Sequence, residues 1–171
     1  MKLIAAVDQN WNLGYAGELL FHIPADLKRF RMLTSGNAVV MGRKTLESLP
    51  GGRPLSNREN IVLTRNAAYQ AEGVTVAHSL QSLFSLLGQT PFSEKEVFVI
   101  GGAEVYALLL PYCESALITH VNATRPADCA LPNLSALEGW KVAERSEELT
   151  HEELSFSYVT YQNLFPCVLK A

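Results

Sequence analysis

The chain has 171 residues, of which 48% are hydrophobic and 18% charged, and its formal net charge is −3. This composition is that of a globular protein and excludes a disordered chain, and the acidic total gives no support to general nucleic-acid binding. The length is that of one domain, so residues 1–171 are expected to form a single domain.

The first half of the chain alternates short apolar runs with helical patterns. Residues 3–7 are typical of a buried strand, and residues 8–23 of a long irregular loop. Residues 23–30 predict a helix, with Pro24 in its first turn and Gly36 beyond its end. The next expected elements are a strand over 38–41, a helix over 43–49, strands over 60–64 and 74–77, and a helix over 79–87.

The second half continues the alternation and then changes. Residues 97–100 form the clearest buried strand, followed by Gly101-Gly102 and a helix that ends near Pro111. A strand is expected over 117–121, and antiparallel strands are expected from Trp140 onward. The pattern predicts an α/β fold: a central, mostly parallel twisted sheet of about eight strands with an antiparallel C-terminal edge, flanked by about four helices.

The N-terminal residues and the cysteines bear on location and metal binding. The apolar run over 3–7 is too short for a signal peptide, and no stretch approaches the roughly 20 apolar residues of a membrane helix. Cys113, Cys129 and Cys167 form no Cys-x-x-Cys pair, which is unlike a zinc site or a disulfide framework. We therefore expect a cytoplasmic protein with reduced thiols, no metal and no membrane partner.

Two predicted strands end in glycine directly before a helix, at Gly42 and at Gly101-Gly102. Ligands of open α/β sheets bind beyond such strand ends, and glycine lets the backbone approach a phosphate at a helix start. Neither junction is G-x-G-x-x-G. The junctions can hold a dinucleotide or be plain turns, and Arg43, Lys44 and Arg65 can pair with an extra phosphate or form a solvated surface.

Asp26 is the most informative carboxylate, because it lies in a first helical turn beside the apolar face of Leu27 and Phe30. It can be partly desolvated and bind an amidine-like ligand edge, or be an ordinary helix-start aspartate. His22 and His120 are candidate general acids, but neither has an obvious partner in the sequence, which favours a structural role. Trp11 lies in the expected loop, where it looks exposed.

Five segments, in this order, resemble the dihydrofolate reductase family over the chain from Leu3 to its end. They are IPADL at 23–27, VMGRKT at 40–45 with Glu47-Ser48, RENIVL at 58–63, IGGAEVY at 100–106 and ITH at 118–120. The resemblance implies an NADPH-dependent oxidoreductase that reduces 7,8-dihydrofolate to tetrahydrofolate, with hydride passing from nicotinamide C4 to pterin C6 and a proton to N5. It also implies antifolate inhibitors as ligands, and a monomer.

The same resemblance implies the site residues. The catalytic group would be Asp26, Phe21, Thr119 and Leu19, with Asp26 on the pterin N–H edge, Thr119 bonded to Asp26, and water delivering the proton. The substrate would contact Ile4, Ala5, Ala6, Asp26, Leu27, Phe30, Leu49, Leu55, Arg58, Ile100 and Thr119. NADPH would contact Ala6, Gly14, Leu19, Gly42, Arg43, Lys44, Thr45, Leu63, Thr64, Arg65, Ile100, Gly101, Gly102, Ala103, Glu104, Val105 and Tyr106. Arg58 would bind the glutamate tail, residues 8–23 would close over the nicotinamide, and the paired glycines would share a cis bond.

The chain departs from the family's pattern at several places, which include Leu19, where a methionine is frequent, and Gly51-Gly52, which lengthen a loop. Leu20-Phe21 stands where a Pro-Trp pair is common, and Glu104 stands where a basic residue often helps bind the adenine-side phosphate. Two alternatives are open. One is a related NADPH-dependent pyrimidine or pterin reductase of the same fold, such as the riboflavin-pathway enzyme, against which Asp26 and Arg58 favour folate. The other is a non-catalytic nucleotide- or partner-binding α/β domain.

Overall fold

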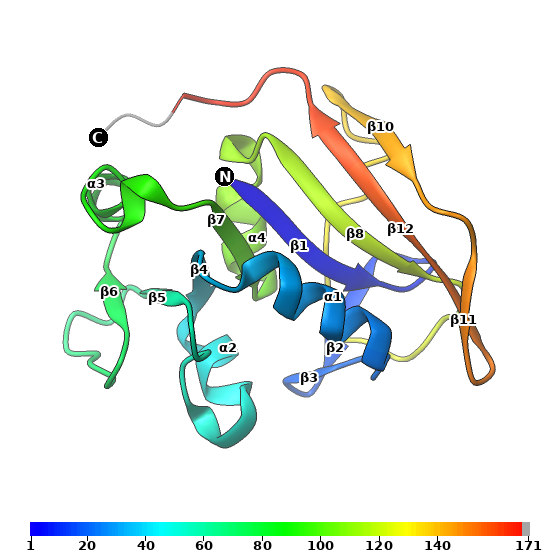
Figure 1. Ribbon diagram of the computed structural model, residues 1–171, viewed down its shortest axis with the longest axis horizontal. Coiled ribbons are helices and arrows are strands. Elements are labelled where there is room, and N and C mark those ends of the chain that lie inside the picture. The colour runs from blue at the N-terminus through cyan, green and yellow to red at the C-terminus, as the bar shows by residue number, and fades with distance from the viewer. Residues whose placement is uncertain (169–171) are drawn as a thin grey trace.

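Residues 1–168 are described by the computed structural model, and a large twisted sheet runs through its centre (Figure 1). The sheet has nine strands in the order β10-β12-β8-β1-β7-β4-β5-β6, and β11 pairs with β12 beside this path. The strands are β1 (Lys2–Val7), β4 (Ala38–Gly42), β5 (Glu59–Leu63), β6 (Thr75–Ala77), β7 (Val97–Gly101), β8 (Ser115–Val121), β10 (Trp140–Arg145), β11 (Leu149–His151) and β12 (Leu154–Asn163). The strands from β8 to β6 are parallel, whereas β12 runs antiparallel to β8, β10 and β11. The predicted mixed sheet is confirmed.

The parallel strands are short apolar runs because both of their faces are covered. In β4, residues 38–41 are Ala-Val-Val-Met, and none of these side chains reaches solvent. By contrast, β10 lies at the edge of the sheet and is exposed along most of its length, in keeping with its charged residues Lys141, Glu144 and Arg145. Apolar runs in the sequence thus mark the central strands of the sheet, and charged residues mark the edge strand β10.

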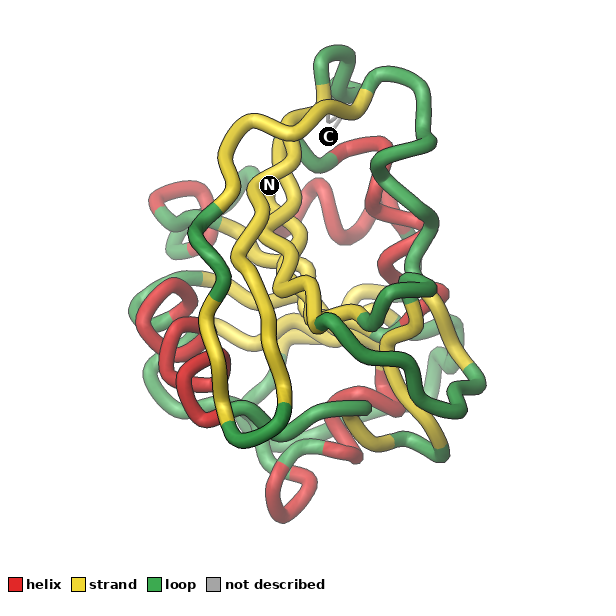
Figure 2. Tube along the Cα trace, turned by 90° about the vertical axis from the view of Figure 1, so that its right-hand side faces the viewer, coloured by secondary structure: helices red, strands yellow, loops and turns green. Residues whose placement is uncertain are grey.

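Four helices flank the sheet within residues 1–168, and α1 and α4 lie on opposite faces (Figures 1 and 2). The helices are α1 (Pro24–Thr34), α2 (Arg43–Ser48), α3 (Leu80–Leu87) and α4 (Ala103–Leu109), and short 3-10 turns occupy Pro50–Gly52, Phe92–Glu94 and Leu110–Tyr112. Pro24 fits the first position of α1 because its φ is already fixed near the helical value. Ser79 and Ser82 close the start of α3 with a reciprocal capping box. No helix in the described part of the chain has the length and apolar character needed to cross a membrane.

The expectation of an irregular loop over residues 8–23 is wrong in part. This segment contains β2 (Asn12–Tyr15) and β3 (Glu18–Leu19), which join β9 (Cys129–Ala130) in a second, three-stranded sheet. Strands this short carry too little periodicity to be recognised in a sequence. Trp11 is also not exposed: only 7% of it reaches solvent, because it packs edge-on against His120 and Tyr161.

The carboxyl ends of the parallel strands meet at one edge of the large sheet. In the register of the sheet, Ala6 near the end of β1 is opposite Thr119 of β8. Met41 near the end of β4 is opposite Gly101, the last residue of β7. The topology therefore collects most of the predicted site residues along this edge.

Candidate active site

Asp26 lies in the first turn of α1, and its carboxylate meets the middle of the large sheet. Thr119 Oγ1, on β8, donates a hydrogen bond of 2.5 Å to Asp26 Oδ1. Burial raises the pKa of Asp26 above its ordinary value, while the hydrogen bond from Thr119 and the charge of Arg29 act to lower it. Asp26 is thus a partly desolvated carboxylate rather than a plain helix-start residue.

Arg29 follows Asp26 by one helical turn and is also half-buried. The guanidinium carbon of Arg29 lies 4.2 Å from the centre of the Tyr158 ring. Tyr158 belongs to β12 and is directly opposite Thr119 in the sheet. Sequence reasoning missed this pair, because neither residue carries a recognisable motif and the two come together only through the pairing of β8 with β12.

Apolar side chains from separate elements form one wall beside α1. They belong to a single hydrophobic cluster, in which Ile4 is buried, and Phe30, Leu49, Leu55 and Ile100 are half-buried. Partly exposed apolar side chains of this kind can pack against a flat ring or an aryl group. Ala5 and Ala6 continue β1 past this wall, and Leu27 is half-buried on α1. The structure therefore assembles the predicted substrate residues from α1, β1, β7 and the end of α2.

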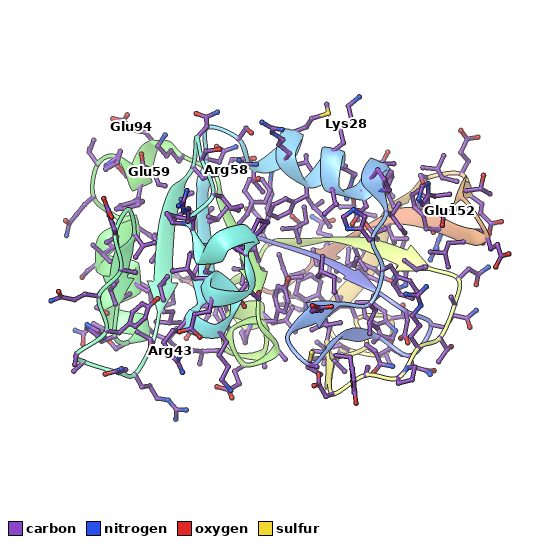
Figure 3. All side chains as sticks on the ribbon, turned by 90° about the horizontal axis from the view of Figure 1, so that it is seen from below. Lys28, Arg43, Arg58, Glu59, Glu94 and Glu152 are labelled. Atoms are coloured by element: carbon purple, nitrogen blue, oxygen red, sulfur yellow. The ribbon has the colours of Figure 1, made fainter. Side chains whose placement is uncertain are left out.

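Arg58 lies next to α1, on the same face of the molecule as Lys28 (Figure 3). Its Nε donates to Thr34 Oγ1 at 3.1 Å, and its terminal nitrogens donate to the carbonyl oxygens of Ser56 at 2.6 Å and Arg31 at 3.4 Å. These partners, within residues 1–168, are neutral acceptors. They orient the guanidinium but leave its positive charge uncompensated, which suits an anionic ligand group.

The two glycine junctions are brought side by side. A Cβ on Gly42 would lie 3.2 Å from Val105 Cγ2 and 3.9 Å from the Gly101 carbonyl oxygen, and a Cβ on Gly102 would lie 3.4 Å from Thr45 Oγ1. Gly101 has a φ of +125°, a conformation that L side chains rarely adopt. The Gly101-Gly102 peptide bond is cis, as the resemblance implies. The missing side chains at Gly42 and Gly102 therefore let the two junctions pack against each other, which brings the starts of α2 and α4 together. Two helix starts side by side can face the phosphates of one dinucleotide, so the residues present fit such a ligand.

Charged side chains surround the junction at Gly42. Arg43 donates to Glu47 at 2.7 Å within α2, and Lys44 is exposed. Arg65 and Glu104 face one another across 4.0 Å, and both are more than 90% exposed. Figure 3 shows that Arg43 and Arg58 lie far apart on the molecule. The cationic side chains near Gly42, which could bind an extra phosphate, are thus separate from the Arg58 guanidinium beside α1.

The remaining predicted cofactor residues lie along the same edge of the sheet. Leu63 ends β5 and is buried, Thr64 follows it half-buried, and Ala103 begins α4. Tyr106 is buried, and its hydroxyl donates to the carbonyl oxygen of Ile4 at 2.7 Å, which ties α4 to β1. Ile4 therefore serves both the apolar wall and the support of α4, a link that no pattern in the sequence indicates.

The segment expected to act as a lid is anchored at its inner end. Phe21 is buried in a cluster with Val121 and Phe156, and the guanidinium carbon of Arg125 lies 4.7 Å from its ring centre. Leu19, which is 66% exposed, is the last residue of β3 and pairs with Gly14, which is buried between β3 and β9. Residues 15–19, which include the Ala16-Gly17 turn of the hairpin, are thus the exposed part of this segment.

His120, one of the candidate acids, does not face Asp26. It hydrogen-bonds to the Tyr161 hydroxyl at 3.0 Å, and burial, followed by the charge of Arg145, lowers its pKa to about 4. It lines a hollow of about 240 Å³ with Gln9, Asn122, Arg145 and other residues, none of which belongs to the predicted site. His120 is therefore neutral near pH 7 and is a structural residue.

Comparison with known proteins bears on this arrangement. The sequence model described as "Dihydrofolate reductase" matches residues 1–163. The chain is 39% identical over 157 residues to dihydrofolate reductase type 3 of Salmonella typhimurium, covering 92% of this chain and 93% of that one. It is 34% identical over 158 residues to dihydrofolate reductase of Bacillus subtilis, covering 92% and 90%. Among solved structures, dihydrofolate reductase from Enterococcus faecalis, complexed with NADP(H) and RAB-propyl, superposes with a TM-score of 0.82 at 34% identity, covering 94% of each chain.

Proposed function

The chain belongs to the dihydrofolate reductase family and catalyses the NADPH-dependent reduction of 7,8-dihydrofolate to tetrahydrofolate, and we propose that Asp26 recognises the pterin ring in this reaction. The observation that carries the proposal is the geometry of its carboxylate. Within residues 1–168, Thr119 donates one hydrogen bond to Oδ1, which leaves a second acceptor position on Oδ1 and both positions on Oδ2 for a ligand at the edge of the apolar wall. Two hydrogen bonds to one flat N–H edge are what a carboxylate in this position can accept.

Asp26 acts by charge and orientation rather than by handing over a proton. When bound, NADPH supplies the hydride. An ionised Asp26 stabilises positive charge on the pterin ring, which favours protonation at N5 and makes C6 more electrophilic. Asp26 contacts the 2-amino side of the ring, so N5 receives its proton from water. Thr119 keeps the carboxylate in position by its hydrogen bond.

The neighbouring residues bind the other parts of the substrate. Leu27, Phe30, Leu49 and Leu55 pack on the benzoyl ring, and Arg58 binds the α-carboxylate of the glutamate tail. The neutral hydrogen-bond partners of Arg58 support this role, because they hold the guanidinium while leaving its charge for the ligand. Ile4, Ala5, Ala6 and Ile100 border the pterin itself.

The glycine edge holds the cofactor in this proposal. Gly42, Gly101 and Gly102 let the starts of α2 and α4 lie together at the pyrophosphate, and Arg43, Lys44 and Arg65 bind the 2′-phosphate. The exposed part of the β2–β3 hairpin, with Leu19 at the end of β3, closes over the nicotinamide and excludes water, while Phe21 forms an apolar wall. We also propose that the chain works as a single-domain monomer in the cytoplasm; sedimentation of the purified protein tests the oligomeric state.

A direct assay tests the proposed substrate. NADPH oxidation is followed with dihydrofolate and, separately, with the ribosylamino-pyrimidine of the riboflavin pathway, each with and without methotrexate. We expect dihydrofolate-dependent oxidation that methotrexate abolishes, and no turnover of the pyrimidine. Turnover of the pyrimidine alone, or binding of NADPH without any turnover, would contradict the folate assignment.

A further inference from the structure

Arg29 adopts a position that an ordinary surface arginine does not. Residues three apart on a helix share a face, so Arg29 lies on the same side of α1 as Asp26. Instead of extending into solvent, its guanidinium stacks 4.2 Å from the centre of the Tyr158 ring. Lys28, the preceding residue, shows the ordinary behaviour, since its side chain points away from the molecule (Figure 3).

The charge of Asp26 and the ring of Tyr158 offset the cost of half-burying Arg29. Burial lowers the pKa of Arg29, and the negative charge of Asp26 and the nearby Tyr158 act in the opposite direction. The Tyr158 ring adds a cation–π contact. Because Tyr158 is opposite Thr119 in the sheet, the same strand pair that places the donor for Asp26 also places the platform for Arg29.

Side chains from several elements face Asp26. In the described part of the chain, Arg29 is the one of these that carries a charge near pH 7. Thr119 of β8 is neutral. Tyr158 of β12 and Tyr106 of α4 both feel the charge of Asp26, and burial raises the pKa of each hydroxyl, so both are neutral near pH 7. The positive charge of Arg29 therefore has no competitor among these neighbours in setting the potential at the carboxylate.

We propose that Arg29 is a positioning residue for Asp26. Its positive charge favours the ionised carboxylate when the site is empty and lowers the pH at which the site takes up a proton. This inference rests on the proposed role of Asp26. A positive charge nearby opposes protonation both of the Asp26 carboxylate and of a pterin bound to it. Removing that charge is expected to move both proton-uptake steps to higher pH.

The direct readout is the carbon-13 chemical shift of the Asp26 carboxyl group, titrated in the protein without ligands. The variants are Arg29→Met, which keeps most of the stem but removes the charge, and Arg29→Lys, which keeps the charge. Lys28→Met is the matched control, because it removes an equal charge from the exposed neighbour. Tyr158→Leu removes the platform and tests the same interaction from the other strand.

In Arg29→Met, we expect the Asp26 titration midpoint to rise by about 0.5 to 1 pH unit. Arg29→Lys should restore most of the wild-type midpoint, Lys28→Met should not move it, and Tyr158→Leu should raise it by less than Arg29→Met. Equal midpoints in wild type and Arg29→Met, or equal shifts in Arg29→Met and Lys28→Met, would overturn the proposal. If Arg29→Met does not fold, the Tyr158→Leu midpoint decides: a rise supports the proposal, and a midpoint equal to that of wild type overturns it.

The pH profile of hydride transfer is measured on the same variants. We expect the profile of Arg29→Met to shift to higher pH by a similar amount, whereas a purely structural role would lower the rate equally at every pH. An equal loss at every pH would overturn the effect on catalysis. If wild type fails to turn over dihydrofolate, the proposed function fails, but the carbon-13 titration still decides whether Arg29 controls Asp26.

Discussion

Thr119 Oγ1 donates to Asp26 Oδ1 over 2.5 Å, and this bond joins the middle of the large sheet to the first turn of α1. Only 2% of Thr119 reaches solvent, and its neighbours Ala6 and Tyr158 hold it in register on both sides. The position of the carboxylate is therefore set by the pairing of β8 with β1 and β12 rather than by α1 alone.

Replacing Thr119 by valine removes the hydroxyl at nearly constant volume. Because the bond to Thr119 acts to lower the pKa of Asp26, Thr119→Val should raise that pKa further. It should also weaken dihydrofolate binding, because the carboxylate is held less firmly. The effect should be smaller than the roughly 10- to 100-fold weakening that loss of a direct ligand hydrogen bond of about 1.5–3 kcal/mol would give. Thr119→Ser, which keeps Oγ1, is the control. Equal affinities in the valine and serine variants would contradict this account.

Arg58→Leu should remove the contact with the glutamate tail. The KM for dihydrofolate should rise by about 10- to 100-fold, in line with about 1.5–3 kcal/mol for a charge-assisted contact. The rate with a tail-less pterin should be unaffected. Thr34→Val, which removes the acceptor of Arg58 Nε, should show a smaller effect of the same kind. Equal losses for the two substrates would remove Arg58 from the tail site.

Tyr106→Phe tests the link between α4 and β1. The variant leaves the buried carbonyl of Ile4 without its donor, so we expect the free energy of unfolding to fall by about 1–3 kcal/mol. Urea denaturation of wild type and variant measures this. Tyr15→Phe is the control, because Tyr15 is 56% exposed and its change should stay within about 0.5 kcal/mol. Equal effects of the two substitutions would show that the bond to Ile4 contributes nothing.

We expect His120 to make the folded protein less stable in acid. Its pKa falls from the ordinary 6.5 to about 4, because of burial first and the charge of Arg145 second. The folded state thus binds this proton more weakly than the unfolded state, so stability is lost as pH falls from 6.5 towards 4. His120→Gln should remove about 1–2 kcal/mol of that loss, an amount reduced for its partial exposure.

The measurement is urea denaturation of His120→Gln, wild type and His22→Gln at about pH 7 and about pH 5. His22 is exposed, and His22→Gln is the control for replacing an imidazole by an amide. If His120→Gln loses stability on acidification as steeply as wild type, His120 is not a source of the acid sensitivity.

The sequence predicts the central sheet well for a physical reason. Strands such as β4 and β7 are covered on both faces, so their apolar runs are visible without knowledge of their partners. The small sheet of β2, β3 and β9 is different. Its strands are short, and β2 finds β9 far along the chain, so no local pattern reveals it.

The same distinction applies to the site. Asp26, Arg58 and the glycines lie within segments that a family pattern marks. The pairs Arg29–Tyr158 and Tyr106–Ile4 depend on which strands lie next to one another, which local periodicity does not encode. The expectation that Trp11 is exposed is wrong for the same reason, because the residues that cover it, His120 and Tyr161, are on β8 and β12.

The central claim is that the Asp26 carboxylate stabilises the pterin during hydride transfer. Its most direct test is the single-turnover rate of hydride transfer at neutral pH in Asp26→Asn and wild type, with the NADPH dissociation constant measured on both. We predict a rate lower by about a hundredfold or more in Asp26→Asn, with NADPH affinity essentially unchanged. An undiminished rate of hydride transfer in Asp26→Asn would contradict the claim.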